Sequence, residues 1–199
     1  MSFDERLLRV ARTWGHTPEL DRAVGRFALL GEHAAVWLAI GVAGQVADAP
    51  RRGRWRRATG TVAGTYALNT AVKLVVRRRR PRLDGLAPLV GTPTTLGFPS
   101  AHASTAFAGA LAYSRVGLPA LPLYALAAGL AYSRLYLGVH YPSDVLAGAM
   151  LGTAVAKLRS RTRGERGAAR PLEQASAAAQ SNGHAPVRLA TPPPTRGAA

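Results

Sequence analysis

Five apolar segments, separated by blocks of arginine, constrain this sequence more than any other feature. The segments contain no Asp, Glu, Lys or Arg and cover residues 34–47, 58–72, 98–114, 116–133 and 145–156. A helix that crosses a bilayer needs about 20 largely apolar residues, and each segment approaches that length once its flanks are included. The pattern predicts an all-α fold, namely an integral membrane helical bundle of about five spans.

The N-terminal stretch has a different pattern. Apolar residues recur at helical spacing between charged ones through residues 3–10, and Thr17 followed by Pro18 starts a second stretch of the same kind. We predict an amphipathic N-terminal segment over residues 1–30, which would add a sixth helix at the membrane interface. No secretory signal is expected, because the first long apolar run begins only after Glu32.

The composition changes after Leu158. The last residues are rich in Ala, Pro, Gly and Arg and contain almost no large apolar side chains. Such a stretch cannot bury enough surface to offset its ordering entropy. We therefore predict a membrane-embedded domain over residues 31–158 and a disordered tail over residues 159–199.

Two pairs of glycines at four-residue spacing lie inside the predicted spans, Gly60 with Gly64 and Gly148 with Gly152. In lipid this spacing lets helices approach closely. An alanine- and glycine-rich chain also produces such pairs by chance, so the sequence leaves both readings open.

The charge is strongly basic and unevenly placed. The 199 residues carry 26 Lys and Arg against 10 Asp and Glu, a formal net charge of +16, with blocks at 51–57 and 77–82. Nucleic-acid binding and the cytoplasmic flanks of membrane spans both explain such a balance, although 7% aromatic residues are few for a protein that stacks bases. The absence of cysteine excludes disulfides, a cysteine nucleophile and thiolate-bound zinc.

Three polar clusters interrupt the apolar pattern. Lys73 and the run 77–81 end the second segment, residues 99–102 begin the third, and residues 133–144 lie between the fourth and fifth. If consecutive segments alternate in direction, all three clusters emerge on the same face. Nothing in the composition forces this agreement, so the clusters are expected to form one site.

The side chains of these clusters suit an anion. Ser100 follows a proline at a helix start, where a cap leaves backbone N–H groups free to bind a negatively charged group. Lys73, Arg80 and Arg134 would add three cations, and the arginine fork matches phosphate oxygens. Each residue alone has an ordinary explanation as a cap or a solvated flank; together, ionisable residues beside apolar helices indicate function.

The same clusters contain two histidines and an acid. His140 and Asp144 are four residues apart, so the carboxylate is placed to hold one imidazole nitrogen while the other faces an electrophile. His102 is a second titrating group, suited to protonating a leaving oxygen.

The spacing of the three clusters resembles the type 2 phosphatidic acid phosphatase superfamily, which includes lipid phosphate phosphatases, prenyl diphosphate phosphatases and vanadium-dependent haloperoxidases. The blocks are Lys-x6-Arg-Pro at 73–81, Pro-Ser-x-His at 99–102 and Ser-Arg-x5-His-x3-Asp at 133–144. The resemblance covers about residues 58–158. One position departs from the family pattern, because Ala101 replaces the usual glycine.

The resemblance implies a role for each matching residue. His140 would attack phosphorus and form a phosphohistidine, Asp144 would orient His140, and His102 would protonate the leaving group. The phosphoryl oxygens would be held by Lys73, Arg80, Ser100, Arg134 and the backbone amide of Ala101 or His102. No metal or other cofactor is expected. The run 77–79 lies outside the motif, and we interpret it as a head-group or lipid-surface patch.

The predicted function is hydrolysis of a lipid phosphate or diphosphate at the cell membrane, with the bilayer and a lipid phosphate or prenyl diphosphate as partners and no nucleic acid. Excess positive charge at 51–57 places that face in the cytoplasm and the active site outside it. The alternatives are a vanadate-dependent haloperoxidase and a basic, non-enzymatic membrane or nucleic-acid-binding protein. The identity of the lipid and the oligomeric state stay open.

Overall fold

The computed structural model describes residues 1–160, and these residues form helices and no β-strand. The helices are α1 (Phe3–Thr13), α2 (Pro18–Leu29), α3 (Ala35–Ala47), α4 (Arg52–Val76), α5 (Ala101–Ser114), α6 (Ala120–Tyr136) and a final helix over residues 142–160, with short 3-10 helices at Glu32–Ala34 (η1) and Ala49–Arg51 (η2). The predicted all-α fold is confirmed, and each predicted apolar segment coincides with one helix. The predicted tail lies outside the described residues from position 161 onward.

Side-chain caps set where several helices begin. Ser2 and Glu5 form a capping box at α1, and Thr17 caps α2 directly before Pro18. Ser100 caps α5. Each cap satisfies backbone N–H groups that the first helical turn leaves without a partner.

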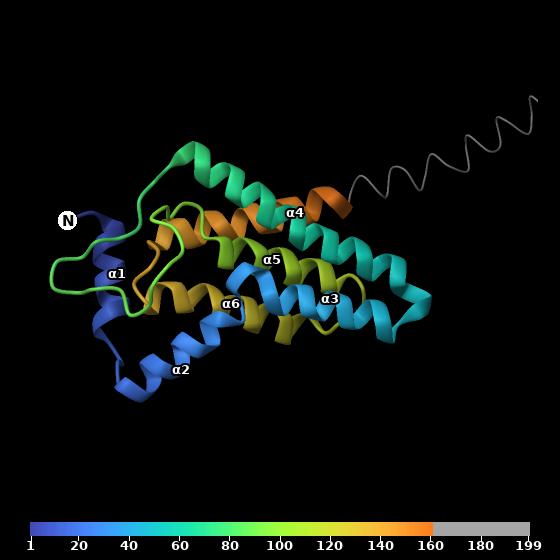
Figure 1. The fold of residues 1–199 in the computed structure, drawn as a ribbon, viewed down its shortest axis with the longest axis horizontal. Helices are drawn as coiled ribbons and strands as arrows, with labels where there is room; N and C mark the ends of the chain where they lie inside the picture. The colour runs from blue at the N-terminus through green and yellow to red at the C-terminus, as the bar shows by residue number, and fades with distance from the viewer. Residues whose placement is uncertain (161–199) are drawn as a thin grey trace, which may run out of the picture. The chain divides into compact units, whose positions relative to one another are not determined.

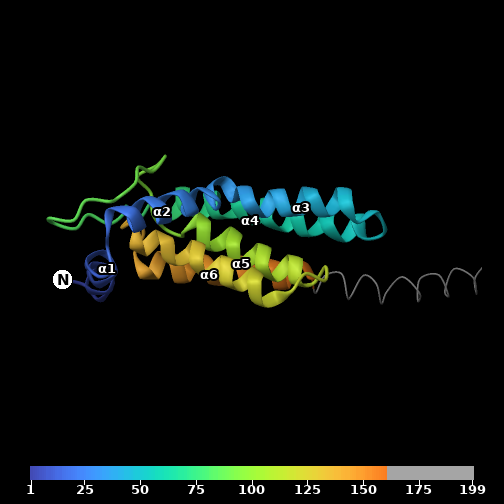
Figure 2. The same cartoon turned by 90° about the horizontal axis from the view of Figure 1, so that it is seen from below.

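The main helices pack in two layers, which Figure 2 shows edge-on. The antiparallel pair α3 and α4 forms one layer, and α5, α6 and the final helix form the other. Aromatic side chains fill the space between the layers: Trp37 of α3 stacks on Tyr113 of α5, with ring centroids 6.4 Å apart. The Tyr113 hydroxyl donates to the Trp37 carbonyl oxygen at 2.7 Å, so the buried polar group is satisfied.

The two glycine pairs differ in their surroundings. A Cβ atom at Gly148 or Gly152 would collide with the backbone of α5, at the carbonyl oxygens of Ser100 and Ser104 respectively. At Gly60 and Gly64 the nearest group is the flexible side chain of Arg159, at 3.6 Å or more. Of the two pairs, only Gly148 and Gly152 are therefore required for close helix packing.

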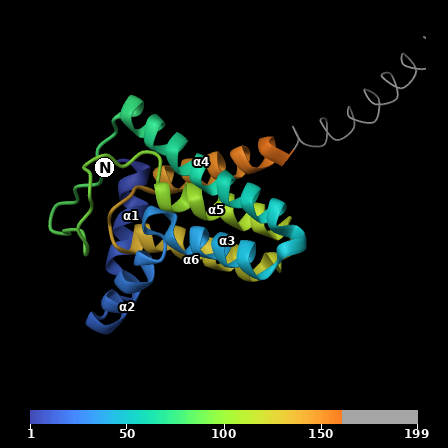
Figure 3. The same cartoon turned by 45° about the vertical axis from the view of Figure 1, so that its right-hand side comes forward.

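The N-terminal helix lies across one end of the bundle. Figures 1 and 3 show α1 beside the long connection between α4 and α5. Leu8 is fully buried in this position, and Arg12 donates to the carbonyl oxygen of Ala87 at 2.8 Å. The same end carries the end of α4, the start of α5, the end of α6 and the start of the final helix. The polar clusters of the sequence therefore meet there.

Within residues 1–160, no single helix combines the length and apolar composition of a membrane span. One pair reaches both together, namely α2 with Glu32–Ala47, across a bend of 47°.

Candidate active site

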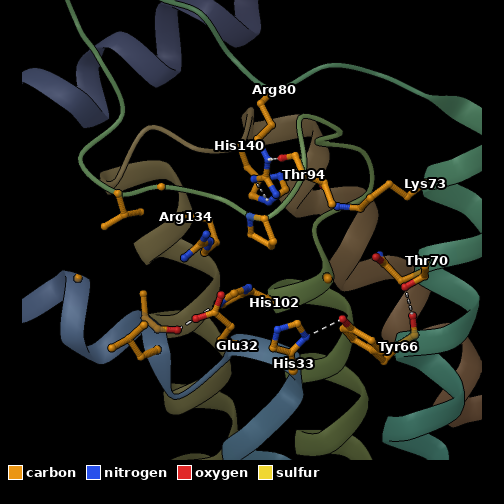
Figure 4. Close-up of a pocket in the computed structure, with 18 residues that line it drawn as sticks. Glu32, His33, Tyr66, Thr70, Lys73, Arg80, Thr94, His102, Arg134 and His140 are labelled. Carbon is orange, nitrogen blue, oxygen red and sulfur yellow. Dashed lines mark hydrogen bonds between the residues drawn. The ribbon is translucent and has the colours of Figure 1, made fainter.

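A cavity of about 190 Å³ opens at this end of the bundle. Six of the eight predicted site residues line it: Lys73, Arg80, Ala101, His102, Arg134 and His140. They come from α4, the connection after it, α5, α6 and the loop before the final helix, and Figure 4 shows five of the six side chains converging on the cavity. Segments more than 60 residues apart in the sequence are thus brought into one pocket.

The cations of the pocket are held mainly by backbone carbonyl groups. Lys73 Nζ donates to the carbonyl oxygen of Leu96 at 3.2 Å, and Arg80 Nε donates to that of Thr94 at 2.8 Å. Arg134 is 7% exposed, and its Nε atom has no hydrogen-bond partner among the described residues. A concentration of buried positive charge with unused donors favours binding of a multiply charged anion.

His140 is an almost completely enclosed side chain of the cavity wall, with 2% of its surface exposed. Its Nε2 atom lies 3.0 Å from a terminal nitrogen of Arg80. Because a guanidinium only donates, Nε2 acts as the acceptor and carries the free lone pair. Burial and the charges of Arg80, Arg134 and Lys73 hold the pKa of His140 well below its usual range, so the ring is neutral at neutral pH.

Asp144 stands behind His140 rather than in the cavity. Its side chain is fully buried, and one carboxylate oxygen lies 3.6 Å from Nδ1 of His140. That oxygen also accepts from the backbone N–H of Tyr141 at 2.9 Å. The carboxylate thus faces the nitrogen opposite the one that points into the pocket, at a distance slightly beyond a normal hydrogen bond.

Ser100 also lies outside the cavity lining. It is fully buried, and its hydroxyl accepts from the backbone N–H of Ala103 at 3.5 Å. Its own N–H donates to the carbonyl oxygen of Asp144 at 2.9 Å. The residue therefore joins the start of α5 to the start of the final helix, while the first turn of α5 reaches the cavity at Ala101 and His102.

The imidazole of His102 is fixed by α2. Its Nε2 atom lies 3.0 Å from the carbonyl oxygen of Ala28, which accepts and so places a hydrogen on Nε2. Nδ1 has no hydrogen-bond partner within residues 1–160. The nitrogen left for proton exchange is therefore Nδ1.

Arg78 occupies a different position from the surface patch that its sequence suggested. One terminal nitrogen donates to Asp144 at 2.9 Å and to the Ser143 hydroxyl at 2.6 Å. The other donates to Asp4 of α1 at 2.9 Å. The guanidinium also stacks over the ring of Tyr141, 4.6 Å from its centroid. Arg78 thus links the N-terminal helix to the acid behind His140.

A second group of polar residues lines the same cavity and was not identified from the sequence. It consists of Glu32, His33, Tyr66, Asn69 and Thr70. In Figure 4, Glu32, His33 and Tyr66 lie on the opposite side of His102 from His140 and Arg80. A signal for the α4 members was present: positions 66, 69, 70 and 73 fall on one face of a helix.

Known proteins share both the sequence pattern and this fold. The PAP2 superfamily model matches residues 55–168. A decaprenylphosphoryl-5-phosphoribose phosphatase of Mycobacterium tuberculosis is 42% identical over 141 residues, which are 70% of this chain and 78% of that protein. The protein of the same name from Mycolicibacterium smegmatis is 44% identical over 128 residues, or 64% and 68% of the two chains.

Solved structures extend the likeness to the fold. A transmembrane PAP2 type phosphatidylglycerolphosphate phosphatase from Bacillus subtilis superposes with a TM-score of 0.68 at 23% identity, covering 81% of this chain and 85% of that one. Aquifex aeolicus LpxE superposes with a TM-score of 0.66 at 23% identity, covering 81% of this chain and 96% of that one. A bacterial vanadium-dependent iodoperoxidase superposes with a TM-score of 0.64 at 16% identity, covering 79% of this chain and 48% of that one.

The family match covers more than half of the chain, and the curated relatives are named as phosphatases. The predicted family and the predicted enzyme class, a phosphatase, are therefore confirmed. The chain belongs to the PAP2 superfamily.

Proposed function

We propose that this protein is a membrane phosphatase that hydrolyses a phosphate monoester of a lipid through a phosphohistidine intermediate. The observation that supports this most strongly is the convergence of Lys73, Arg80 and Arg134 on the cavity into which Nε2 of His140 points. Phosphoryl transfer depends mainly on positioning and on stabilising negative charge. Three cations around a neutral, buried imidazole provide both.

In the first step, the Nε2 lone pair of His140 attacks phosphorus and the bond from phosphorus to the ester oxygen breaks. His102 enters this step as the imidazolium, with a hydrogen on each ring nitrogen and its charge facing the bound phosphate. The departing alkoxide takes the proton from Nδ1, and His102 is left neutral with its Nε2–H still donated to the carbonyl oxygen of Ala28. Arg80 must release Nε2 as it engages a phosphoryl oxygen. The hydrogen on Nδ1 of His140 faces Asp144, which stabilises the positive charge that develops on the ring.

In the second step, water attacks the phosphohistidine. His102, now neutral at Nδ1, accepts a proton from that water, the bond between phosphorus and His140 breaks, and inorganic phosphate leaves. His140 and His102 return to their starting protonation states. The residues that hold the oxygens in both steps are Lys73, Arg80, Arg134 and the backbone N–H groups at Ala101 and His102, with Ser100 placing the start of α5.

The proposed substrate is a polyprenyl-linked phosphosugar. The two mycobacterial relatives are named as decaprenylphosphoryl-5-phosphoribose phosphatases, and the M. tuberculosis match covers 78% of the relative. The lining of the cavity supports this choice, because its cationic end continues into a wall of hydroxyl, amide and carboxylate groups.

The proposed location is the cell membrane, with several spans. Large apolar side chains are exposed on the outer faces of the bundle, among them Val46, Val75, Leu121 and Met150. Such side chains on the outside of a helical bundle support a location where lipid surrounds it. The arginine block 51–57 lies at the end of the bundle opposite the cavity (Figure 1), which supports a cytoplasmic location for that end and a cavity that opens on the other side of the membrane.

The test is phosphate release in detergent by the purified protein and by His140→Ala. Decaprenylphosphoryl-5-phosphoribose, a prenyl diphosphate and a phosphatidate form the substrate panel. The proposal predicts release from at least the first compound and its loss in His140→Ala. Equal release by both proteins would contradict it.

A further inference from the structure

The polar residues at the far end of the cavity have no role in the phosphate chemistry described above. They are Glu32 and His33 of η1 and Tyr66, Asn69 and Thr70 of α4. From them we propose that this end is a subsite for the vicinal hydroxyl groups of the substrate's sugar. The inference rests on the proposed phosphatase function and adds a determinant of substrate choice to it.

Unsatisfied acceptors support a ligand that donates hydrogen bonds. Asn69 is fully buried, and its amide nitrogen donates to the Ser104 hydroxyl at 2.8 Å. Its Oδ1 atom has no partner among the described residues. Glu32 is partly exposed and accepts no hydrogen bond within residues 1–160, although its charge acts on Arg134. A phosphate oxygen only accepts, whereas a hydroxyl group donates as well, so these atoms match hydroxyls and not a second phosphate.

The same two elements also provide groups that both donate and accept. The Tyr66 hydroxyl lies 2.9 Å from Nδ1 of His33, and Figure 4 shows Thr70 next to this pair, one turn along α4 from Tyr66. A pair that joins an imidazole to a phenol adapts its donor and acceptor roles to a bound hydroxyl. Both η1 and α4 therefore combine an acceptor with an adaptable group, which suits the two hydroxyl groups of a diol.

The charge of Glu32 makes the subsite selective. A carboxylate beside the cationic end repels an anionic group attached directly to the scissile phosphate, so a diphosphate is disfavoured there, while a ribose that separates two phosphates is accepted. The cations that hold the scissile phosphate then fix the distance between the phosphate and the hydroxyl groups.

The backbone at η1 is shaped to present these residues. His33 and Ala34 both adopt left-handed conformations, with φ of 49° and 62°, which are unfavourable for residues other than glycine. Just before them, a Cβ atom at Gly31 would lie 2.6 Å from the His102 ring. Such strain persists where surrounding contacts enforce it, often beside a functional site.

The test compares a prenylphosphoryl-5-phosphoribose with its 2,3-dideoxyribose analogue, since the two differ only in hydroxyl groups. Wild-type kcat/KM is expected to favour the ribose compound at least tenfold. Glu32→Ala, Tyr66→Phe and Thr70→Val should each lower kcat/KM for the ribose compound by about three- to tenfold, as expected for one hydrogen bond, and leave the analogue within about twofold. The matched controls are Glu19→Ala and Tyr132→Phe, which are exposed outside the cavity.

Each other outcome is informative. If Glu32→Ala lowers kcat/KM for the ribose compound and for the analogue alike, or leaves the preference for the ribose compound unchanged, the proposed subsite is wrong. A selective loss for a 2-aminoalkyl phosphate in Glu32→Ala would also contradict it, because Glu32 would then bind an ammonium group. His140→Ala separates the two proposals. Activity retained by His140→Ala on both compounds overturns the phosphatase mechanism, whereas an inactive His140→Ala together with an unchanged preference in Glu32→Ala overturns only the subsite.

Discussion

Arg78 donates a hydrogen bond to the carboxylate of Asp144 at 2.9 Å, and so connects the acid behind His140 to the N-terminal helix. The second terminal nitrogen of Arg78 donates to Asp4 at the same distance. Asp4 in turn accepts from the backbone N–H of Ser143 at 3.0 Å and from the Ser143 hydroxyl. The N-terminal helix therefore takes part in holding the loop that carries the proposed nucleophile.

Arg78→Gln is expected to lower kcat by about 10- to 100-fold, because Asp144 loses a charged donor and is held less firmly behind His140. KM should change much less, since Arg78 does not line the cavity. Steady-state kinetics measure both. Arg79→Gln is the control, because that side chain is exposed, and an equal fall in the control would show that general charge is responsible.

The docking of α1 should weaken in acid. Burial acts to raise the pKa of Asp4, but hydrogen bonds from Ser143 and Arg78 outweigh it and hold the pKa below its usual value. Stability from such a group is present above the unfolded pKa of about 4 and is lost as the pH falls below it. Thermal unfolding from pH 6 to pH 3 should show this loss in the wild type, and a smaller one in Asp4→Asn. Identical pH dependence in both would contradict the role of Asp4.

The fall of kcat/KM at low pH, which is the acidic limb of its pH profile, should report the protonation of His140. Burial and the neighbouring cations keep its pKa low, so the limb is expected below about pH 6.5, the usual histidine value. Arg80→Gln removes a positive charge next to Nε2 and should move the limb to higher pH, alongside a lower overall rate. The substrate's own phosphate ionisation affects both proteins equally. A limb that stays in place would mean that another group controls it.

Gly152→Ala should destabilise the fold by about 1–3 kcal/mol, because its Cβ would collide with the backbone of Ser104 in α5. Gly64→Ala is the matched control, with only a flexible side chain nearby, and its higher helix propensity should leave stability unchanged or slightly raised. Thermal unfolding in detergent measures both. Equal effects would show that the close packing at Gly152 is not required.

Much of the fold follows from local sequence signals. The apolar segments, the proline after Thr17 and the cap at Ser100 predict where helices lie, and alternation of direction predicts that Lys73 and Arg134 meet at one end. Those signals depend on neighbouring residues along the chain, so they are visible without a structure.

The parts that the sequence did not reveal depend on contacts between distant segments. Nothing local distinguishes Arg78 from Arg79 in a run of four arginines; only the position of Asp4, 74 residues earlier, draws one of them into a hydrogen-bond network. Glu32 was interpreted as the boundary of an apolar segment, because the left-handed turn that brings it to the cavity has no glycine at its two strained positions.

The most direct test of the mechanism is to look for the covalent intermediate on His140. Single-turnover reactions with substrate labelled in the scissile phosphate, quenched in alkali, should yield a phosphorylated peptide that contains His140. The label should form and decay in the wild type, form more slowly in His102→Gln because the leaving alkoxide is no longer protonated, and be absent from His140→Ala. Phosphate release without any labelled protein, or equal labelling of His140→Ala, would contradict the account.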